Sequence, residues 1–398
     1  MPSSVRITTR NSAELRCYVC RRDVSEPHSF YSGLCKECGD TNFRKRFETA
    51  DLTGYNALVT GGRIKIGFET ALKLLRCGAE VHVTTRFVSD AMRRFGEETD
   101  SAIWQRRLHF IPADFRSLSC VQALIDDLLA KLDKLDILIN NAAQTVRRPP
   151  IFYDHLITPK ADKMLSSVGQ ASLLHVDVPG RPPQSLLLDG SHSTIVNWKD
   201  PDFISSLSSI PLLPEDHTAS RTHFPEGILD KDGQQEDRRL FNSWMMRLGD
   251  VHTVEFLEVL YINLIAPFMF CSQLKKVMKK STNQPVSFIV NVSAMEGNFN
   301  DPEKDCRHPH TNIAKAGINM MTRTSAPDFL VDGILMNCVD PGWITDEKPY
   351  SDDKPRRTKM VIDEIDGAAR ICDPIFRGVN EADMSCGCLF KNYKEFPW

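Results

Sequence analysis

Residues 56–75 read NALVTGGRIKIGFETALKLL, and this stretch decides the fold. The segment NALVTGG, at 56–62, is a short apolar run that ends in glycines, which is typical of a buried strand followed by a tight turn. The segment FETALKLLRCG, at 68–78, has apolar residues at helical spacing and stops at Gly78. The stretch therefore predicts a strand, a glycine turn and a helix in direct succession.

The alternation of strand and helix continues along the chain. Helical spacing recurs in VQALIDDLLAKL and in AKAGINMMTRTSA. Apolar runs that predict further strands lie at 79–86, 107–115, 135–143, 285–294 and 334–343. Because strands that alternate with helices form right-handed units with a parallel sheet, the predicted fold class is α/β, a Rossmann-like doubly wound parallel sheet.

The composition is that of a globular protein. Of the 398 residues, 41% are hydrophobic and 25% charged, enough for one large domain or two modest ones. The net charge of −3 gives no global attraction to nucleic acid or to an acidic membrane. No apolar run approaches the roughly 20 residues of a membrane helix. We therefore expect neither nucleic acid nor a membrane as a partner.

The N-terminus and the cysteines bear on the compartment. The segment MPSSVRITTR lacks the apolar core of a secretory signal, although its Arg, Ser and Thr content leaves a mitochondrial transit peptide as an alternative. The twelve cysteines include a cluster with metal-like spacing, which favours thiols over disulfides. We expect a reducing, intracellular and cytoplasmic protein.

Four cysteines near the N-terminus have the spacing of a metal site. The segment CYVCRRDVSEPHSFYSGLCKEC contains two C-x2-C pairs separated by fourteen residues: Cys17, Cys20, Cys35 and Cys38. Four thiolates at about 2.3 Å form a closed tetrahedral Zn²⁺ site, which is structural because it has no open position. A redox C-x-x-C is the alternative, and it is weaker because there are two such pairs.

These cysteines place a zinc module at residues 1–50, ahead of an α/β domain at 51–398. A module of this size needs its metal in order to fold. His28 and His82 are spare ligands that a four-thiolate site does not require. The basic run at 44–46 is slight for nucleic-acid binding, so we expect the module to dock or to stabilise.

The turn TGGRIKIG, at 60–67, has the composition of an anion-binding turn. Its glycines let backbone N–H groups and a helix N-terminus approach the pyrophosphate of a dinucleotide. The residues that we assign to cofactor binding in this turn are Thr60, Gly61, Arg63, Lys65, Ile66 and Gly67.

The motifs together resemble the short-chain dehydrogenase/reductase family over roughly residues 52–398. The turn resembles that family's T-G-x-x-x-G-x-G, NNAA at 140–143 resembles its N-N-A-G, and PGWIT at 341–345 resembles its P-G-x-x-T. The resemblance implies hydride transfer between a nicotinamide and a carbonyl or alcohol. It also implies a homo-oligomer.

The resemblance assigns roles to single positions. Asp114 matches the aspartate that meets the adenine, and Asn141 lies in the motif beside the turn. Asn263 matches the asparagine that holds a water of the proton relay, and Lys315 matches the catalytic lysine, which also holds the nicotinamide ribose. By the same resemblance, the residues near the nicotinamide carboxamide are Pro341, Gly342 and Thr345.

Lys65 stands where the family has the middle glycine of its turn. A glycine there lets the backbone come close to the cofactor. The lysine either obstructs the cofactor, pairs with a phosphate or turns to solvent, and the sequence leaves these alternatives open.

The end of the second strand bears on the choice of cofactor. A protein that binds NAD(H) usually ends this strand with an acidic residue, but here it ends in Thr84, Thr85 and Arg86. The guanidinium of Arg86 suits a 2′-phosphate, and Arg63 could add to it. We expect NADP(H) rather than NAD(H); the alternative is that either arginine pairs with a nearby acid.

The catalytic tyrosine of the family is absent. The residue four before Lys315 is Thr311, in HPHTNIAKAG at 308–317. A phenol titrates at about pH 10 and a neighbouring cation can bring it into range, whereas a threonine hydroxyl is too weak an acid. His310 is the substitute that we consider, with His308 and Glu296 as further candidates. The structural alternative is that Pro309 sets a turn, Thr311 or Asn312 caps the helix, and Lys315 falls one turn into it.

The catalytic serine is also in doubt. The family pattern is S-x-x-G, and with Gly297 as its glycine the serine position is Ala294. Ser293 lies one residue earlier and, on a strand, faces the other way. Ser293 can serve only if the turn is bulged.

Residues 154–240 form an insertion relative to the family. This segment is rich in Ser, Pro, Asp and Gly, a composition that resists regular structure. We expect a loop-rich surface excursion or a protein-binding loop rather than a lid.

Two functions are consistent with these features. The first is an NADP(H)-dependent oxidoreductase with an atypical proton donor and an unknown small-molecule substrate. The second is a catalytically inactive family member that acts as a cofactor sensor or scaffold through its zinc module and insertion. A zinc-dependent nucleic-acid binder is a distant third.

Overall fold

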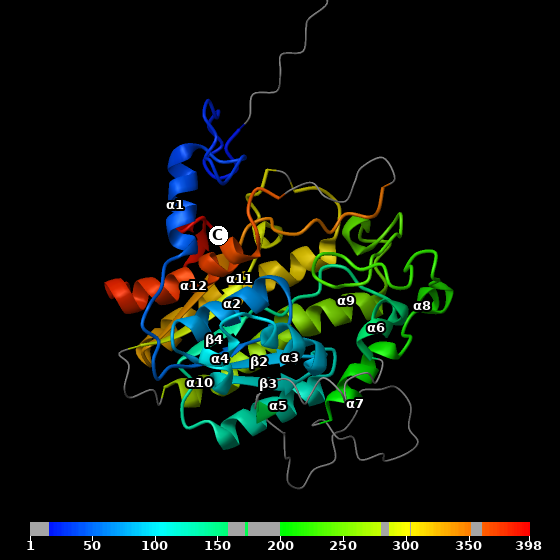
Figure 1. Ribbon diagram of the computed structural model, residues 1–398, viewed down its shortest axis with the longest axis horizontal. Coiled ribbons are helices and arrows are strands. Elements are labelled where there is room, and N and C mark those ends of the chain that lie inside the picture. Colours follow the sequence, from blue (N-terminus) through cyan, green and yellow to red (C-terminus); the bar gives the residue numbers. More distant parts are fainter. Residues whose placement is uncertain (1–15, 158–171, 174–199, 280–285, 303, 352–359) are drawn as a thin grey trace, which may run out of the picture.

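The computed structural model describes residues 16–157, 172–173, 200–279, 286–302, 304–351 and 360–398. A single, mostly parallel sheet lies between two layers of helices (Figure 1). The α/β class predicted from the alternating pattern is therefore confirmed.

All six predicted strands are present in the sheet. They are β1 (Asn56–Val59), β2 (Glu80–Thr85), β3 (Leu108–Pro112), β4 (Ile137–Asn140), β6 (Ser287–Val292) and β7 (Ile334–Asp340). Three short strands were not predicted: β5 (Ser172–Leu173), β8 (Leu389–Lys391) and β9 (Lys394–Phe396). The order is β5-β3-β2-β1-β4-β6-β7-β8-β9, and the antiparallel pair is β8 with β9.

The strand order reverses between β1 and β4. From β1 the chain runs outward to β2 and β3, and then returns to place β4 on the other side of β1. A crevice at the carboxyl ends of the strands where the order reverses is the usual ligand site of such sheets. Thr60 and Asn141, which directly follow β1 and β4, lie at this point.

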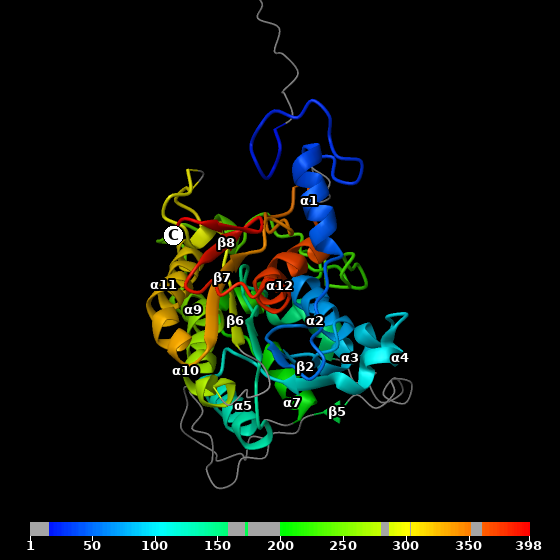
Figure 2. The ribbon, with the colours of Figure 1, turned by 90° about the vertical axis from the view of Figure 1, so that its left-hand side faces the viewer.

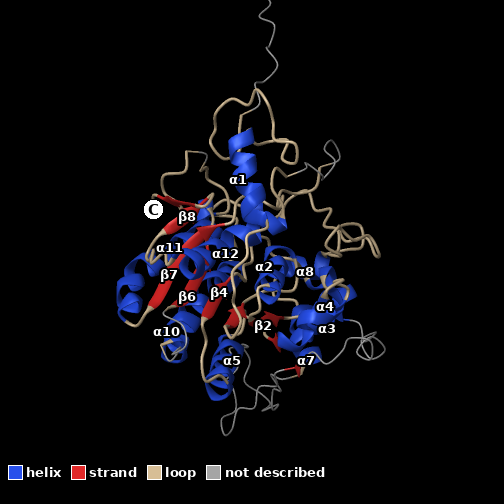
Figure 3. Ribbon diagram, turned by 60° about the vertical axis from the view of Figure 1, so that its left-hand side comes forward, coloured by secondary structure: helices blue, strands red, loops and turns tan. Residues whose placement is uncertain are grey.

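Helices cover both faces of the sheet (Figure 3). One apolar core lies under α2 (Lys65–Arg76), α3 (Val88–Gly96) and α12 (Glu364–Glu381). The other lies under α5 (Leu118–Lys131), α10 (Ala266–Met278) and α11 (Pro309–Val331). Because both faces are buried, the strands read as continuous apolar runs, and this is what made them predictable.

The remaining helical elements are short. The α-helical ones are α4 (Ser101–Trp104), α6 (Asp154–Ile157), α7 (Pro201–Ser206) and α8 (Pro214–Thr218). The 3-10 turns are η1 (Gln105–Arg107), η2 (Pro150–Phe152), η4 (Leu207–Ser209), η5 (Ser243–Met245) and η7 (Met295–Gly297).

One helix of the described residues, Thr253–Met278, is long and apolar enough by length and composition alone to cross a membrane. It consists of α9 (Thr253–Leu260), the π-helical turn η6 (Tyr261–Ile265) and α10. Ala266, Phe270 and Leu274 of this helix are fully buried against the sheet, as in the core helix of a globular domain.

The N-terminal module is docked on the α/β domain rather than separate from it. The helix α1 (Lys36–Arg46) lies beside α12 (Figure 2). Arg46 contacts Asp363 at 2.6 Å and Asp366 at 3.1 Å, and Lys45 contacts Asp373 at 2.6 Å. The pairs of Arg46 with Asp366 and of Lys45 with Asp373 are buried, whereas Asp363 is partly exposed, and together they hold the module against α12.

The described part of the insertion packs against the domain. Ile204 of α7 joins the core under α5, and Phe224 is fully buried among Phe87, Phe152 and Tyr153. This part is loop-rich, but it is not the loosely held excursion that its composition suggested, because apolar residues between the prolines anchor it. The segments 158–171 and 174–199 lie outside the described residues.

Candidate functional site

The turn after β1 and the turn after β4 are joined by hydrogen bonds. Thr60 Oγ1 accepts from the backbone N–H groups of Asn141 at 2.9 Å and Ala142 at 3.0 Å. Asn141 Nδ2 in return donates to the carbonyl oxygens of Thr60 at 3.0 Å and Gly61 at 3.2 Å. Gly61 has φ +67°, a left-handed conformation that suits glycine. Two residues assigned from separate motifs thus form one rigid corner.

Gly67 is required by close packing. A Cβ at this position would collide with the Gly61 carbonyl oxygen and with Asn141 Nδ2. The helix α2 begins at Lys65, earlier than the predicted start at 68, so its N-terminus and the unpaired N–H groups there belong to the turn. Gly61, Gly67 and this helix N-terminus together have the form of a pyrophosphate-binding corner.

Lys65 adopts a left-handed backbone conformation, which favours glycine. Its φ is +54°, and its Nζ lies 3.7 Å from Glu347 Oε1 in the loop after β7. The side chain therefore pairs with an acid instead of merely turning to solvent. Ile66, the next residue, packs against Gly367 of α12.

Arg63 is almost fully buried and already has partners. Its Nη1 donates to Asp90 Oδ2 at 2.5 Å, and its Nη2 donates to Gln234 Oε1 at 2.8 Å. Burial lowers the pKa of Arg63 to about 10, so it remains a cation at neutral pH. Of the two roles considered for Arg63 from the sequence, the structure therefore shows the pairing with a nearby acid.

Arg86 also contacts the chain itself. Its Nη1 donates to Ser208 Oγ at 3.1 Å, its Nη2 donates to the Tyr153 hydroxyl at 3.2 Å, and its guanidinium lies over the Tyr153 ring. These partners are neutral hydroxyls, so the charge of Arg86 is not compensated by them. Ser208 belongs to the insertion.

Asp114 is buried beside Arg116. Burial alone would raise the pKa of Asp114, but the Arg116 guanidinium, whose Nη2 lies 2.6 Å from Oδ2, holds it below the usual value. The same guanidinium donates to the Leu207 carbonyl oxygen of the insertion at 3.0 Å. Asp114, the residue matched to adenine recognition, is thus ionised. Its partner Arg116 is in contact with the insertion.

Asn263 lies in the π-helical turn η6 and is buried. Its Oδ1 accepts from the Gln144 N–H at 2.8 Å, and its Nδ2 donates to the Gln144 carbonyl oxygen at 3.0 Å. Such π-turns inside α-helices frequently occur at functional sites. This contact ties the helix to the segment that follows β4.

Lys315 is buried in α11 and points at strand β6. Its Nζ donates to the Val292 carbonyl oxygen at 2.7 Å, and burial lowers its pKa. Thr311, four residues before it, is also buried, and its Oγ1 has no hydrogen-bond partner among the described residues. Lys315 thus occupies the place expected of the family's lysine, and Thr311 occupies the place of the tyrosine but carries no phenol.

Ser293 does not face the site. Its Oγ donates to Asn319 Oδ1 of α11 at 2.5 Å, and Asn319 Nδ2 donates to the Gly297 carbonyl oxygen at 3.1 Å. The hypothesis of a bulge that would turn Ser293 toward a substrate is therefore wrong, because this serine is used in helix packing. Ala294 occupies the serine position of the family pattern and carries no hydroxyl.

His310 is buried and faces Glu255. Its Nε2 lies 3.8 Å from Glu255 Oε1, and neither ring nitrogen has a hydrogen-bond partner among the described residues. Burial lowers the pKa of His310 to about 4, so the imidazole is neutral at pH 7. A neutral imidazole has no readily given proton, which argues against His310 as the acid.

His308 directly precedes the helix that carries Lys315. It has φ +40°, stacks on the Trp244 ring at 3.9 Å between centroids, and its Nδ1 lies 2.9 Å from the Trp244 carbonyl oxygen. The predicted cap at Thr311 or Asn312 is wrong, because α11 already begins at Pro309 and Lys315 lies further into it than one turn.

The loop after β7 contains PGWIT. Gly342 has φ +92°, and its N–H donates to Asp340 Oδ1 at 2.9 Å. The Trp343 N–H donates to the Tyr18 hydroxyl at 2.7 Å, and Thr345 Oγ1 donates to Glu347 Oε1 at 3.0 Å. The conformation of this loop is thus held in part by the N-terminal module.

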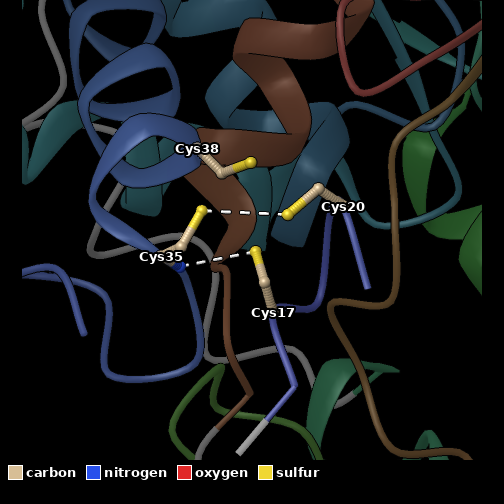
Figure 4. A group of neighbouring side chains, drawn as sticks. All are labelled: Cys17, Cys20, Cys35 and Cys38. Atoms are coloured by element: carbon tan, nitrogen blue, oxygen red, sulfur yellow. Dashed lines mark hydrogen bonds between the residues drawn. The ribbon is translucent and has the colours of Figure 1, made fainter. Parts of the chain in front are cut away.

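The four cysteines of the module converge (Figure 4). The Sγ atoms of Cys17, Cys20, Cys35 and Cys38 all lie within 4.8 Å of one another, and the distance from Cys20 to Cys35 is 3.8 Å. Thiolates at about 2.3 Å from a tetrahedral centre are about 3.8 Å apart, so the cluster fits Zn²⁺. His28 Nδ1 instead accepts the N–H groups of Phe30 and Tyr31, as a loop residue.

Comparisons with known proteins agree with this geometry. Residues 55–156 match the family described as short chain dehydrogenase, and residues 241–365 match the family described as Enoyl-(Acyl carrier protein) reductase. An uncharacterized protein, R665 of Acanthamoeba polyphaga mimivirus, is 31% identical over 374 residues, 90% of this chain and 71% of that protein. The short chain dehydrogenase/reductase dpchH of Colletotrichum higginsianum is 40% identical over 95 residues, 23% of each chain.

Solved structures share the fold. A dehydrogenase/reductase from Sinorhizobium meliloti aligns with a TM-score of 0.51 at 17% identity, over 85% of this chain and 94% of that one. A short chain dehydrogenase from Burkholderia cenocepacia, solved in complex with NADP, aligns with a TM-score of 0.51 at 18% identity, over 85% and 96%. The fold and site define an oxidoreductase-like Rossmann protein. The chain belongs to the short-chain dehydrogenase/reductase family.

The residues present fit a dinucleotide better than they fit the family's chemistry. The corner at Gly61 and Gly67, with a Cβ excluded at the second position, and the ionised Asp114 fit the cofactor. Thr311 and Ala294 do not fit the family's proton transfer. Sequence reasoning missed the partners Gln234, Ser208, Glu347 and Tyr18 because each contact joins segments that are distant in the chain, and no pattern predicts which segments meet.

Proposed function

We propose that this protein binds NADP(H) and does not carry out the tyrosine-dependent carbonyl reduction of its family. The observation that carries the proposal is the corner formed by Thr60, Gly61, Gly67 and Asn141, which its hydrogen bonds hold rigid beside the N-terminus of α2 at the point where the strand order reverses. A bound dinucleotide would supply a nicotinamide for hydride transfer.

Different residues of the chain would bind different parts of the dinucleotide. The N-terminus of α2 supplies N–H groups to a pyrophosphate. Asp114 accepts from an adenine amine, and Lys315 donates to a ribose hydroxyl in place of the Val292 carbonyl oxygen. Gly342 and Thr345 lie in the loop that would meet the carboxamide.

Charge favours the phosphorylated dinucleotide. Asp90 is shared by Arg63, Arg93 and Arg94, at 2.5 to 2.7 Å, and Arg93 also pairs with Glu97 at 2.9 Å, so three cations lie beside two carboxylates. Arg86 adds a fourth cation whose described polar partners are neutral. A 2′-phosphate would be attracted to this net positive cluster.

A second candidate function keeps catalysis and uses His310. The contact with Glu255 supports it, because a carboxylate beside an imidazole can orient it and stabilise its cation. Against it stands the burial that keeps this imidazole neutral. We further propose a structural Zn²⁺ in the cysteine cluster and a cytoplasmic, reducing location.

Fluorescence titration of the full-length protein with NADPH and with NADH tests the binding proposal. We expect NADPH to bind at least about tenfold more tightly, a difference of about 1.4 kcal/mol. Arg86→Ala should remove most of that preference, whereas Arg106→Ala, an exposed arginine near β3, should leave it unchanged. If neither nucleotide binds at millimolar concentration, the proposal fails.

Turnover of NADPH with a panel of carbonyl compounds separates the two candidates. We expect no turnover by the natural protein and measurable turnover after Thr311→Tyr combined with Ala294→Ser. Activity in the natural protein that His310→Ala abolishes would instead support the second candidate.

A further inference from the structure

Tyr18 lies between two of the metal-type cysteines and reaches the loop that follows β7. Its hydroxyl accepts the N–H of Trp343 at 2.7 Å, and a Cβ on Gly342 would lie 3.1 Å from the same oxygen. The contact joins residues 325 positions apart in the chain. A tyrosine placed between Cys17 and Cys20 is therefore the direct link from the cysteine cluster to PGWIT.

Apolar contacts reinforce this link. Ile344, within PGWIT, and Ile362, shortly before α12, are buried in one cluster with Cys17 and Leu34 of the module. Ile66, from the glycine turn, packs against the same cluster. The module therefore touches both segments that would hold a dinucleotide, the turn after β1 and the loop after β7.

The module is itself fixed from the other side. The Tyr31 hydroxyl donates to Asp366 Oδ1 of α12 at 2.6 Å, and Arg370 Nη2 donates to Asn42 Oδ1 of α1 at 2.7 Å. These buried bonds anchor the far end of the module. The backbone N–H of Tyr18 also donates to the Gly33 carbonyl oxygen at 3.0 Å, two residues before Cys35, so the position of Tyr18 depends on how the two cysteine pairs are held together.

A metal in the cluster would fix that position. Cys17 and Cys20 are ligand candidates from a segment with little regular structure of its own, and small modules of this kind depend on the metal to order their loops. Without a metal, four thiols must share the same space with no bond between them. The backbone that carries Tyr18 would then be held less firmly relative to the loop.

We propose that Tyr18 is a positioning residue for the PGWIT loop, through which Zn²⁺ in the four-cysteine cluster controls the affinity for NADP(H). The proposal rests on the proposed function where it concerns the nucleotide. The part that concerns Trp343 and the metal stands without it.

Amide hydrogen exchange in the peptide 340–345 of the full-length protein tests the structural part. We expect Tyr18→Phe, which removes one oxygen, to accelerate exchange at Trp343 while the Zn²⁺ content stays at one per chain. Tyr31→Phe is the matched control, since it removes one oxygen from the same module but contacts α12 instead of the loop. Equal exchange in Tyr18→Phe and the natural protein would overturn the proposal.

NADPH titration tests the functional part. Loss of a single hydrogen bond corresponds to about a threefold to tenfold increase in Kd. We expect an increase of this size for Tyr18→Phe and a larger one after Zn²⁺ removal, reversed when Zn²⁺ is added back. Unchanged affinity in both would overturn the coupling. Failure of the natural protein to bind NADPH would instead refute the proposed function, and the exchange experiment would still decide the role of Tyr18.

Discussion

The Nζ of Lys65, in the turn after β1, lies 3.7 Å from Oε1 of Glu347, in the loop after β7. The contact joins the segment suited to a pyrophosphate with the segment suited to a nicotinamide. Lys65 also has φ +54° and is the first residue of α2, where a positive charge is unfavourable. A lysine that is energetically unfavourable at its own position thus forms an ion pair between the two halves of the candidate site.

Replacing Lys65 by glycine should therefore stabilise the protein. A left-handed conformation costs an L-residue roughly 1–2 kcal/mol, and the extra entropy of glycine in the unfolded chain offsets about half of it. We expect Lys65→Gly to raise the free energy of unfolding by about 0.5–1 kcal/mol in urea denaturation. Both variants lose the ion pair with Glu347 and the unfavourable charge at the N-terminus of α2, but Lys65→Ala retains the strained conformation, so it should give no gain. A loss in the glycine variant would contradict this account.

Gly67→Ala should have the opposite effect. The added Cβ meets the Gly61 carbonyl oxygen and Asn141 Nδ2, both part of the rigid corner, so the corner must shift. Overpacking of this kind costs about 1–3 kcal/mol, and NADPH binding should weaken with it. Gly249→Ala is the control, because nothing lies within 4 Å of its Cβ. Thermal unfolding of the two variants side by side checks the difference.

The strands were predictable because burial on both faces makes each an apolar run. β8 and β9 were missed because each has three residues, and the two-residue turn that joins them, Asn392 and Tyr393, lacks the glycine typical of such hairpins. The helix α12 was missed because Gly367 and Pro374 interrupt its pattern, although Asp363 caps it. Tertiary packing overrides these unfavourable residues.

The site was predictable where a motif is local and unpredictable where partners are distant. Thr60, Gly67 and Asn141 lie in short motifs, and the structure brings them together. The contacts of Arg63 and Arg86 with residues of the insertion depend on how a loop-rich segment folds back. No periodicity or spacing in the sequence predicts that the insertion packs back against these two arginines.

Gln234→Ala should make NADPH binding tighter. The amide oxygen of Gln234 occupies one donor of Arg63 at 2.8 Å, a donor that a phosphate would otherwise use. Because one competing hydrogen bond is lost, we expect Kd to fall about twofold to tenfold. Gln122→Ala, on the outer helix α5, removes a comparable amide bond to Gln273 and should leave Kd unchanged. Weaker binding by the Gln234 variant would show that this glutamine aids the nucleotide.

Arg147→Ala should be strongly destabilising. This buried arginine donates to both carboxylate oxygens of Asp216, at 2.6 and 2.7 Å, and to Glu258 at 3.1 Å. Its loss leaves the buried carboxylate of Asp216 without its cation and removes one of the two arginines beside the buried Glu258, which typically costs about 3–5 kcal/mol. Arg221→Ala breaks an exposed pair with Asp154 and should cost at most about 1 kcal/mol. Similar losses for both variants in urea denaturation would contradict the buried network.

Acid sensitivity should depend on His310. Burial lowers its folded-state pKa to about 4, whereas the unfolded chain titrates at about 6.5, so the unfolded state binds the proton first as the pH falls. His310 therefore removes stability progressively between about pH 6.5 and 4, by at most about 3 kcal/mol in total. Glu255, whose pKa burial raises, acts in the opposite direction when it is protonated, but it is present in both proteins compared.

The free energy of unfolding of His310→Gln should accordingly fall less steeply with acid than that of the natural protein, with the two curves parallel above about pH 7. His217→Gln replaces an exposed histidine and should reproduce the natural curve. Should His310→Gln and the natural protein show the same slope between pH 6.5 and 4, the imidazole binds its proton as readily in the folded protein as in the unfolded chain. A charged His310 beside Glu255 would then be available as an acid, which is the condition that the catalytic alternative requires.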